Sequence, residues 1–284
     1  MSTAQLSEIT TPHGATLAVR DWPLPVAVLP RALVLIVHGL GEHSGRYEHV
    51  AQQLNGWGFA VRAFDLGGHG QSSGAPGSLA DDNRLLDDLA LVLDRSRALL
   101  APRVPLVLLG HSLGGLIAAR FVSLGLRHVD GLVLSSPALD PGLNAFQKLL
   151  LATLPQIAPN LRVGNGLNAI YLSHDPVVVA AYRADPLVHD RISARLALFI
   201  AQAGAQTRAL AARWTVPTLL LYAGQDRLVN PQGSRSFAQQ VPADVVTSQC
   251  FEDLYHEIFN ELDAAPVFTA LQEWLALRFA DQAV

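Results

Sequence analysis

Short apolar runs alternate along the chain with segments in which apolar residues recur at every third or fourth position. The runs are rich in valine and leucine and predict strands at 16–20, 32–37, 59–64, 106–109, 131–134 and 218–222. The periodic segments predict helices that bury one face, at 47–57, 81–100 and 112–125. A run that is apolar at every position, such as ALVLIV at 32–37, is typical of a parallel sheet covered on both sides. The pattern therefore predicts an α/β fold with a mostly parallel central sheet and helices on both faces.

The alternation breaks between residues 136 and 214. This stretch is rich in proline and contains a helix-like piece at 144–154, and the sheet pattern resumes at 218–222. The simplest organisation is a core built from residues 1–135 and 215–284, with an inserted, mostly helical cap at 136–214.

Composition excludes several classes of protein. Half of the 284 residues are hydrophobic, and the net charge of −4 comes without a long basic run, so a nucleic-acid partner is not expected. Cys250 is the single cysteine and cannot form an intrachain disulfide. The first ten residues lack the basic and apolar regions of a secretory signal, and no uninterrupted apolar stretch of about 18 residues occurs. We expect a cytoplasmic protein without transmembrane helices.

A serine between glycines, in GHSLGG at 110–115, follows the strand predicted at 106–109 and precedes a predicted helix. This context matches the G-x-S-x-G nucleophile elbow, in which a sharp turn exposes the serine hydroxyl. Glycines on both sides remove the Cβ clashes that would block such a turn. We interpret Ser112 as a nucleophile; the alternative is a structural serine that caps the helix.

A serine hydroxyl needs a base that takes its proton, and in this fold the acid and the base follow the serine in the order Ser, Asp, His. Asp226 lies just beyond the strand at 218–222, and His256 follows the apolar run at 245–251. Loops at the carboxyl ends of parallel strands commonly carry the binding and catalytic residues. We therefore predict that Asp226 orients His256, which serves as the base for Ser112.

Other acidic and histidine residues fit these roles less well. His128 and His189 do not follow a sheet strand, and Asp253 belongs to the same loop as His256. His69 and His111 fit structural roles, in loop hydrogen bonding and in packing beneath the serine turn.

Two backbone N–H groups are needed to hold the oxyanion of a tetrahedral intermediate. Leu113 directly follows the predicted nucleophile, and Leu40 lies in the loop HGLG at 38–41, after an early strand. We predict these two amides as the oxyanion hole; a plain glycine-rich turn at 38–41 is the alternative.

The sequence does not match the metal-binding and nucleotide-binding motifs that it resembles at first sight. The spacing of His38, Glu42 and His43 does not match a zinc motif, and the loop that follows 32–37 lacks the ending of a phosphate loop. No metal and no cofactor are expected.

Three motifs together resemble the monoacylglycerol lipase and lysophospholipase branch of the serine α/β-hydrolases. They are VHGLGEHSGRY at 37–47, FDLGGHGQS at 64–72 and GHSLGG at 110–115, and the resemblance spans roughly residues 10 to 280. It implies an α/β-hydrolase fold and a carboxylic-ester hydrolase whose cap covers an acyl-binding channel. It also implies that Glu42 and Arg46 line the polar end of this channel, near the glycerol of the substrate. From the residues alone, the two would instead form a solvated ion pair at the start of a helix.

The chain departs from this branch at two positions. Gly67 stands where relatives commonly have an arginine, and Leu40 stands where a smaller residue is frequent. The first change concerns the placement of loop 65–74, and the second would narrow the pocket near the scissile carbonyl.

The predicted activity is the hydrolysis of monoacylglycerols or related single-acyl lipids through an acyl-enzyme intermediate. Lysophospholipase, thioesterase, short-chain carboxylesterase and proline-releasing aminopeptidase activity remain alternatives on the same scaffold. A binding protein with a decayed triad and an interaction module are alternatives of other classes. The apolar cap suits an acyl substrate and a transient contact with a lipid surface.

Overall fold

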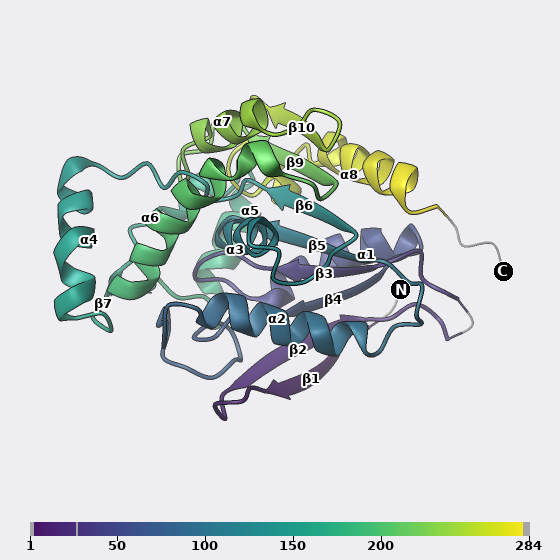
Figure 1. Cartoon of the computed structure of the whole chain (residues 1–284), viewed down its shortest axis with the longest axis horizontal. Coiled ribbons are helices and arrows are strands. Elements are labelled where there is room, and N and C mark those ends of the chain that lie inside the picture. The colour runs from purple at the N-terminus through teal and green to yellow at the C-terminus, as the bar shows by residue number, and fades with distance from the viewer. Residues whose placement is uncertain (1–2, 27, 281–284) are drawn as a thin grey trace.

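Eight strands form one twisted sheet in this computed structural model, which describes residues 3–26 and 28–280 (Figure 1). Residues 1–2, 27 and 281–284 lie outside the described residues, and with them the outermost limits of the predicted core. The strand order is β1-β2-β4-β3-β5-β6-β9-β10. The strands are β1 (Gln5–Thr10), β2 (Thr16–Trp22), β3 (Leu33–Val37), β4 (Ala60–Phe64), β5 (Leu106–His111), β6 (Gly131–Ser135), β9 (Thr218–Ala223) and β10 (Val246–Phe251).

The sheet is parallel from β4 to β10, whereas β2 pairs antiparallel with both of its neighbours, β1 and β4. All six strands predicted from the apolar runs are present, and the predicted mostly parallel sheet is confirmed. The exposed strand β1 carries no apolar run, which explains why the hydrophobic pattern did not reveal it.

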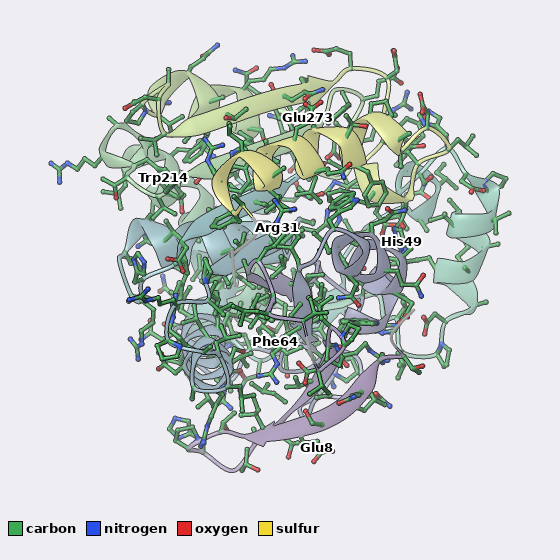
Figure 2. All side chains as sticks on the ribbon, turned by 90° about the vertical axis from the view of Figure 1, so that its right-hand side faces the viewer. Glu8, Arg31, His49, Phe64, Trp214 and Glu273 are labelled. Atoms are coloured by element: carbon green, nitrogen blue, oxygen red, sulfur yellow. The ribbon has the colours of Figure 1, made fainter. Side chains whose placement is uncertain are left out.

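Helices cover both faces of the sheet, and each face has its own core. Alternate residues of β3 separate accordingly: Leu35 packs with α2 (Arg84–Arg97) and α3 (Leu113–Ser123), whereas Ile36 packs with α1 (Glu48–Gly56) and α8 (Ala265–Arg278). A strand buried on both sides must be apolar at every position, which is the pattern seen in the sequence. Figure 2 shows Phe64 inside the molecule, and Glu8 and Glu273 at its outer surface.

The segment between β6 and β9, called the cap below, lies beyond the carboxyl ends of the strands (Figure 1). It contains α4 (Ala145–Ile157), α5 (Pro176–Ala184) and α6 (Ala194–Ala209), together with β7 (Arg162–Gly164) and β8 (Arg191–Ser193). The last two pair as a small antiparallel sheet, which the expectation of a mostly helical insertion did not include. No helix of the described residues has the length and hydrophobicity needed to cross a membrane.

The cap is attached to the core through α6 and through a polar contact. Leu196 and Ile200 of α6 join the core cluster that also contains residues of α3. His43 of the core meets Asp185 of the cap, with 2.9 Å between Nε2 and Oδ2. In contrast, α4 projects at the left of Figure 1 and carries exposed leucine side chains.

Candidate active site

A strained serine sits at the junction of β5 and α3. Ser112 has a φ of 52°, in the left-handed region that residues with a Cβ avoid, and such strain costs about 1–3 kcal/mol. Gly114 permits the turn because a Cβ there would lie 2.0 Å from the Val37 carbonyl oxygen. Although Ser112 occupies the N-cap of α3, its side chain makes no capping hydrogen bond. The helix-capping alternative for this serine is therefore not supported.

The predicted base and its acid lie in contact, as the ends of the neighbouring parallel strands β9 and β10 bring their loops together. His256 Nδ1 and Asp226 Oδ2 are 2.6 Å apart, and both side chains are buried. The other carboxylate oxygen of Asp226 accepts the backbone N–H groups of Leu228 and Val229, which fixes its orientation. Burial opposes a charge on His256, but the Asp226 carboxylate outweighs it and raises the pKa of the imidazole above 6.5.

A cavity of about 270 Å³ opens beside this turn, between the core and the cap. Ser112 and His256 both line it, so side chains from two distant segments face one space. Most of the remaining wall is apolar. The lining residues are Leu40, Ser112, Leu113, Ala138, Pro141, Leu143, Gln147, Leu151, Asn165, Gly166, Leu167, Ile192, Ala197, Ile200, Arg227, Leu228, Val229 and His256.

The two amides predicted as the oxyanion hole also belong to this wall. Leu40 and Leu113 line the cavity, and neither backbone N–H donates a hydrogen bond to another described residue. The Gly39 N–H donates to Glu42 Oε1 over 2.6 Å, which pins the loop that carries Leu40. Unengaged N–H groups beside a serine are what a developing oxyanion requires.

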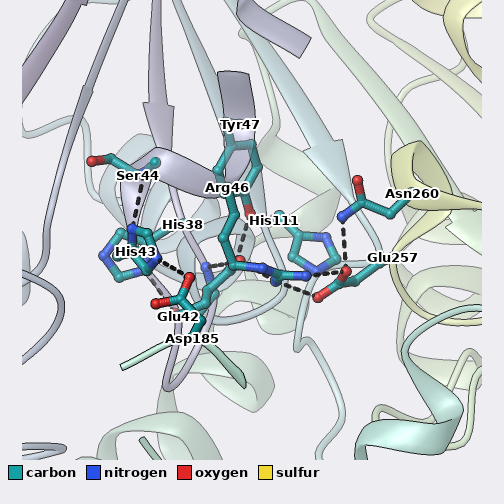
Figure 3. A network of polar contacts seen from close by, with 12 residues as sticks. His38, Glu42, His43, Ser44, Arg46, Tyr47, His111, Asp185, Glu257 and Asn260 are labelled. Atoms are coloured by element: carbon teal, nitrogen blue, oxygen red, sulfur yellow. Dashed lines mark hydrogen bonds and ion pairs between the residues drawn. The ribbon is translucent and has the colours of Figure 1, made fainter. Parts of the chain in front are cut away.

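Glu42 and Arg46 lie in a buried polar network beside the cavity (Figure 3). Arg46 Nη1 is 2.6 Å from Glu42 Oε2, and the same guanidinium donates twice to Glu257, over 2.6 and 2.7 Å. Tyr47 donates its hydroxyl to Glu42 Oε1 over 2.7 Å. Burial alone would raise the pKa of Glu42, but the charge of Arg46 prevails, and the pKa is lowered to about 2.

Glu42 and Arg46 are thus not the solvated ion pair of the simpler alternative, since their side chains are only 5% and 11% exposed. Neither is among the described residues that line the cavity of Ser112, because their polar atoms face each other and Glu257. The contact of Glu42 and Arg46 with a head group stays a prediction.

The other histidines take structural positions. His111 Nδ1 lies 3.1 Å from Ser135 Oγ, and its ring centroid is 4.8 Å from that of His256. Burial lowers the pKa of His111 to about 4, which keeps the ring neutral as it packs beside His256. His69 lies close to Gly67, with 3.2 Å between Nδ1 and the carbonyl oxygen. Among the described residues, no group of three histidine, cysteine or acidic side chains is arranged to hold a metal ion.

The competing residues do not join this site. His128 is exposed and pairs with Asp130, Asp253 is exposed, and His189 of the cap contacts the Gly68 carbonyl. None of the three lines the cavity described above.

Gly67, where relatives commonly have arginine, faces the carboxylate of Asp88: a Cβ on Gly67 would lie 3.6 Å from Asp88 Oδ2. Arg84 supplies the guanidinium that pairs with Asp88 in this chain, at 2.9 Å. Loop 65–74 is held in addition by hydrogen bonds to Asp65 from Ser44 and Gln71.

Comparison with known proteins agrees with this geometry. The sequence profile of the family described as serine aminopeptidase, S33, matches residues 29–263. The monoacylglycerol lipase of Mycolicibacterium smegmatis is 35% identical over 249 residues, which are 87% of this chain and 88% of that relative. The chain belongs to the monoacylglycerol lipase branch of the serine α/β-hydrolases.

Three further relatives were found, among them a second monoacylglycerol lipase. The crystal structure of the Paleococcus ferrophilus monoacylglycerol lipase has a TM-score of 0.84 at 35% identity, covering 92% of this chain and 99% of its own. A phospholipase of Bacillus subtilis is 32% identical, over 89% of this chain and 96% of the relative. A longer abhydrolase domain-containing protein of Dictyostelium discoideum is 34% identical, and the chain spans 29% of its length.

The predicted family, the α/β-hydrolase fold and the assignment to the carboxylic-ester hydrolases are thereby confirmed. Sequence reasoning missed two residues at this candidate site. Glu257 directly follows His256, and Arg227 directly follows Asp226, so their positions next to the predicted triad were a usable signal.

Proposed function

We propose that this chain hydrolyses esters of single-acyl lipids, monoacylglycerols among them, with Ser112 as nucleophile, His256 as base and Asp226 as its orienting acid. The observation that carries the proposal is the pairing of His256 with Asp226 at the wall of the cavity that Ser112 also lines. The names of the M. smegmatis and P. ferrophilus relatives support a monoacylglycerol substrate.

In the proposed reaction, Ser112 Oγ attacks the ester carbonyl carbon while His256 Nε2 takes the hydroxyl proton. The amides of Leu40 and Leu113 hold the oxyanion of the tetrahedral intermediate. The alcohol departs with the proton from His256 and leaves an acyl group on Ser112. Water then gives a proton to His256 and attacks the acyl carbon. The bond to Ser112 Oγ breaks, His256 gives its proton to that oxygen, and the acid is released. These steps require no cofactor.

Residues 136–214 form the proposed cap, and residues 1–135 and 215–284 the proposed core. Apolar side chains of the cap, including Leu151, Ile192 and Ile200, line the cavity beside Ser112. Burying an acyl chain against them is favourable by about 25 cal/mol per Å² of apolar surface removed from water. This wall supports an acyl substrate.

The cap also supports a transient contact with a lipid surface. Leu149, Leu150 and Ile157 of α4 are 63%, 41% and 83% exposed. A helix with such side chains can insert them into the boundary between head groups and acyl chains. We propose a cytoplasmic protein that meets lipid surfaces through α4, where a single-acyl lipid would enter.

The description of the matching family makes a serine aminopeptidase the second candidate. An aminopeptidase has to hold the positive charge of a peptide N-terminus, for which a carboxylate is the natural partner. The described residues that line the cavity include no aspartate or glutamate, and they include Arg227, which would repel that charge. The cavity wall therefore favours acyl esters over peptides.

Initial rates on a matched set of substrates test the proposal: monolauroylglycerol, lauroyl lysophosphatidylcholine, lauroyl-coenzyme A and a butyrate ester. Preference for a lauroyl lipid supports an acyl cavity, preference for butyrate contradicts it, and preference for lauroyl-coenzyme A would make the chain a thioesterase. The control is Ser112→Ala, which should lose several orders of magnitude in turnover. A chain that hydrolyses none of these esters and is not labelled at Ser112 by a fluorophosphonate would be a binding or interaction protein.

A further inference from the structure

Arg227 gives the catalytic cavity its permanent charge. Among the described residues that line the cavity, no other lysine, arginine, aspartate or glutamate occurs. Arg227 directly follows Asp226, and the two N–H groups that bond to Asp226 Oδ1 fix the backbone on the far side of the arginine. The position of the positive charge is therefore tied to the proposed catalytic pair.

Two aromatic rings contact the guanidinium of Arg227 through their faces. Its central carbon lies 5.0 Å from the ring centroid of Tyr171, which belongs to the cap, and 5.8 Å from that of Tyr255, next to His256. Tyr255 in turn stacks on His174 at 3.6 Å. Such contacts attract a cation and hold it in place without neutralising its charge.

Glu261 fixes this aromatic support. Its Oε1 accepts the backbone N–H of Tyr255 over 2.7 Å and lies 2.9 Å from His174 Nδ1. The Glu261 side chain is buried, so the cluster is anchored in the core. Arg227 itself is exposed, and the rings that its guanidinium contacts are held in place.

The N–H groups of Arg227 are available for a ligand. The side chain makes no hydrogen bond and no ion pair with another described residue, in contrast to Arg46, whose donors are engaged by Glu42 and Glu257. A guanidinium presents its donors as a planar fork that fits two oxygens of a phosphate or carboxylate. An unengaged fork at the wall of a cavity is suited to an anionic group.

The cavity has an apolar wall and a charged part formed by Arg227, and the two suit different parts of a substrate. An acyl chain gains by lying along Leu151, Ile192 and Ile200 and gains nothing from a guanidinium. Apart from Ser112 and His256, the other polar side chains of the wall are Gln147 and Asn165, which carry no charge. An anionic head group would therefore be attracted to the part of the wall that Arg227 forms.

We infer that Arg227 is an anion subsite of the catalytic cavity and selects single-acyl esters whose head group carries a phosphate. This inference rests on the proposed ester hydrolysis and deepens it by naming the class of head group. Monoacylglycerols still react, because Ser112 and His256 act on the ester itself, but they leave the fork of Arg227 unused.

Two substrates with the same acyl chain and the same glycerol test the subsite: lauroylglycerol phosphate and monolauroylglycerol. The measured quantity is the ratio of their kcat/KM values in the wild type, in Arg227→Gln and in Arg227→Lys. Loss of a charged hydrogen-bond donor should lower the ratio about tenfold to hundredfold in Arg227→Gln. Arg227→Lys, which keeps the charge and loses the fork, should fall between the wild type and Arg227→Gln.

Arg213→Gln is the matched control. Arg213 is exposed, does not line the cavity, and its replacement changes the net charge of the chain by the same amount. An unchanged ratio in Arg227→Gln would overturn the inference, as would an equal fall in Arg213→Gln, which would indicate attraction by the overall charge.

The carboxylate of the released fatty acid is a second anionic group that Arg227 could bind. Inhibition of monolauroylglycerol hydrolysis by laurate separates the two sources. If Arg227→Gln relieves that inhibition and leaves the substrate ratio unchanged, Arg227 recognises the product and the head-group assignment is wrong. If the ratio falls as expected, the assignment stands whether or not laurate inhibition also changes.

Binding without turnover separates this inference from the proposed function. Calorimetry with lauroylglycerol phosphate should show tighter binding to Ser112→Ala than to Ser112→Ala combined with Arg227→Gln, by about tenfold or more. Absence of hydrolysis in the wild type would overturn the proposed function and leave this binding difference measurable. Equal binding by the two proteins would overturn the subsite, even where hydrolysis is observed.

Discussion

Arg46 donates two hydrogen bonds to Glu257, and this contact joins segments 211 residues apart in the chain (Figure 3). One segment continues from the loop of Leu40, which Glu42 pins through the Gly39 N–H. The other contains His256, the residue next to Glu257. The network therefore fixes the proposed oxyanion amide relative to the proposed base.

Replacement of Arg46 by leucine should destabilise the protein by about 3–5 kcal/mol near neutral pH, because it leaves the carboxylates of Glu42 and Glu257 buried without their partner. Urea unfolding at about pH 7 measures this loss. Arg213→Leu, at an exposed position, is the control and should change the unfolding free energy by less than about 0.5 kcal/mol.

The same variant has a testable pH dependence. In the wild type the pKa of Glu42 is lowered to about 2 from 4.5, so its contribution is present above pH 4.5 and is lost as pH falls toward 2. Without Arg46, burial raises that pKa, and the variant gains stability as the carboxyl takes up a proton. The difference between wild type and variant should therefore shrink from about pH 7 to about pH 4. A difference that is constant over this range would argue against the ion pair as its cause.

The pH profile of ester hydrolysis should report His256. The base acts only when neutral, and the Asp226 carboxylate raises its pKa above 6.5, so kcat/KM should rise with pH to a plateau, with a midpoint above 6.5. Asp226→Asn should lower kcat by about 10⁴-fold through loss of the correct tautomer. It should also move the midpoint of the residual activity to lower pH, because the carboxylate that favours the imidazolium is gone. A midpoint that does not move would mean that another group titrates.

Gly114→Ala should disrupt the serine turn. The new Cβ would lie 2.0 Å from the Val37 carbonyl oxygen, so the backbone must shift, at a typical cost of about 1–3 kcal/mol or more. Because Gly114 lies two residues after Ser112, labelling by a fluorophosphonate should slow as well.

Gly56→Ala is the matched control for the glycine variant. Nothing lies within 4 Å of a Cβ at Gly56, which is the last residue of α1. This substitution should be neutral or stabilising by up to about 1 kcal/mol. Equal unfolding midpoints for the two variants in a thermal melt would refute the close-approach explanation for Gly114.

Much of the fold and the candidate triad could be predicted because short-range patterns determine them. The apolar runs locate the parallel strands, and the topology of such a sheet places the loops that follow β5, β9 and β10 at one edge. Asp226 follows β9 and His256 follows β10, and because these strands are neighbours the two side chains come into contact.

The polar network and the aromatic contacts of Arg227 could not be predicted in the same way. Arg46 and Glu257 are adjacent only in space, and nothing in the local sequence of either residue identifies its partner. Likewise, Tyr171 of the cap reaches Arg227 only after the cap has folded over the core. The β7–β8 pair was missed because its strands are three residues long and lack a continuous apolar pattern.

Charge on the exposed face of α4 should separate hydrolysis at a lipid surface from hydrolysis in solution. Leu149 and Ile157 are 63% and 83% exposed, so replacing both by aspartate leaves the core intact. Inserting these charges into a bilayer boundary is unfavourable, and anionic lipids would repel them as well. The rate on monoacylglycerol embedded in vesicles should fall about tenfold, whereas the rate on a dissolved butyrate ester should stay within about twofold. Replacing both residues by alanine instead should have an intermediate effect on vesicles, because it removes apolar surface without adding charge. An equal loss on both substrates would place the effect in the cavity or in folding, and an unchanged rate on vesicles would show that α4 does not make the lipid contact.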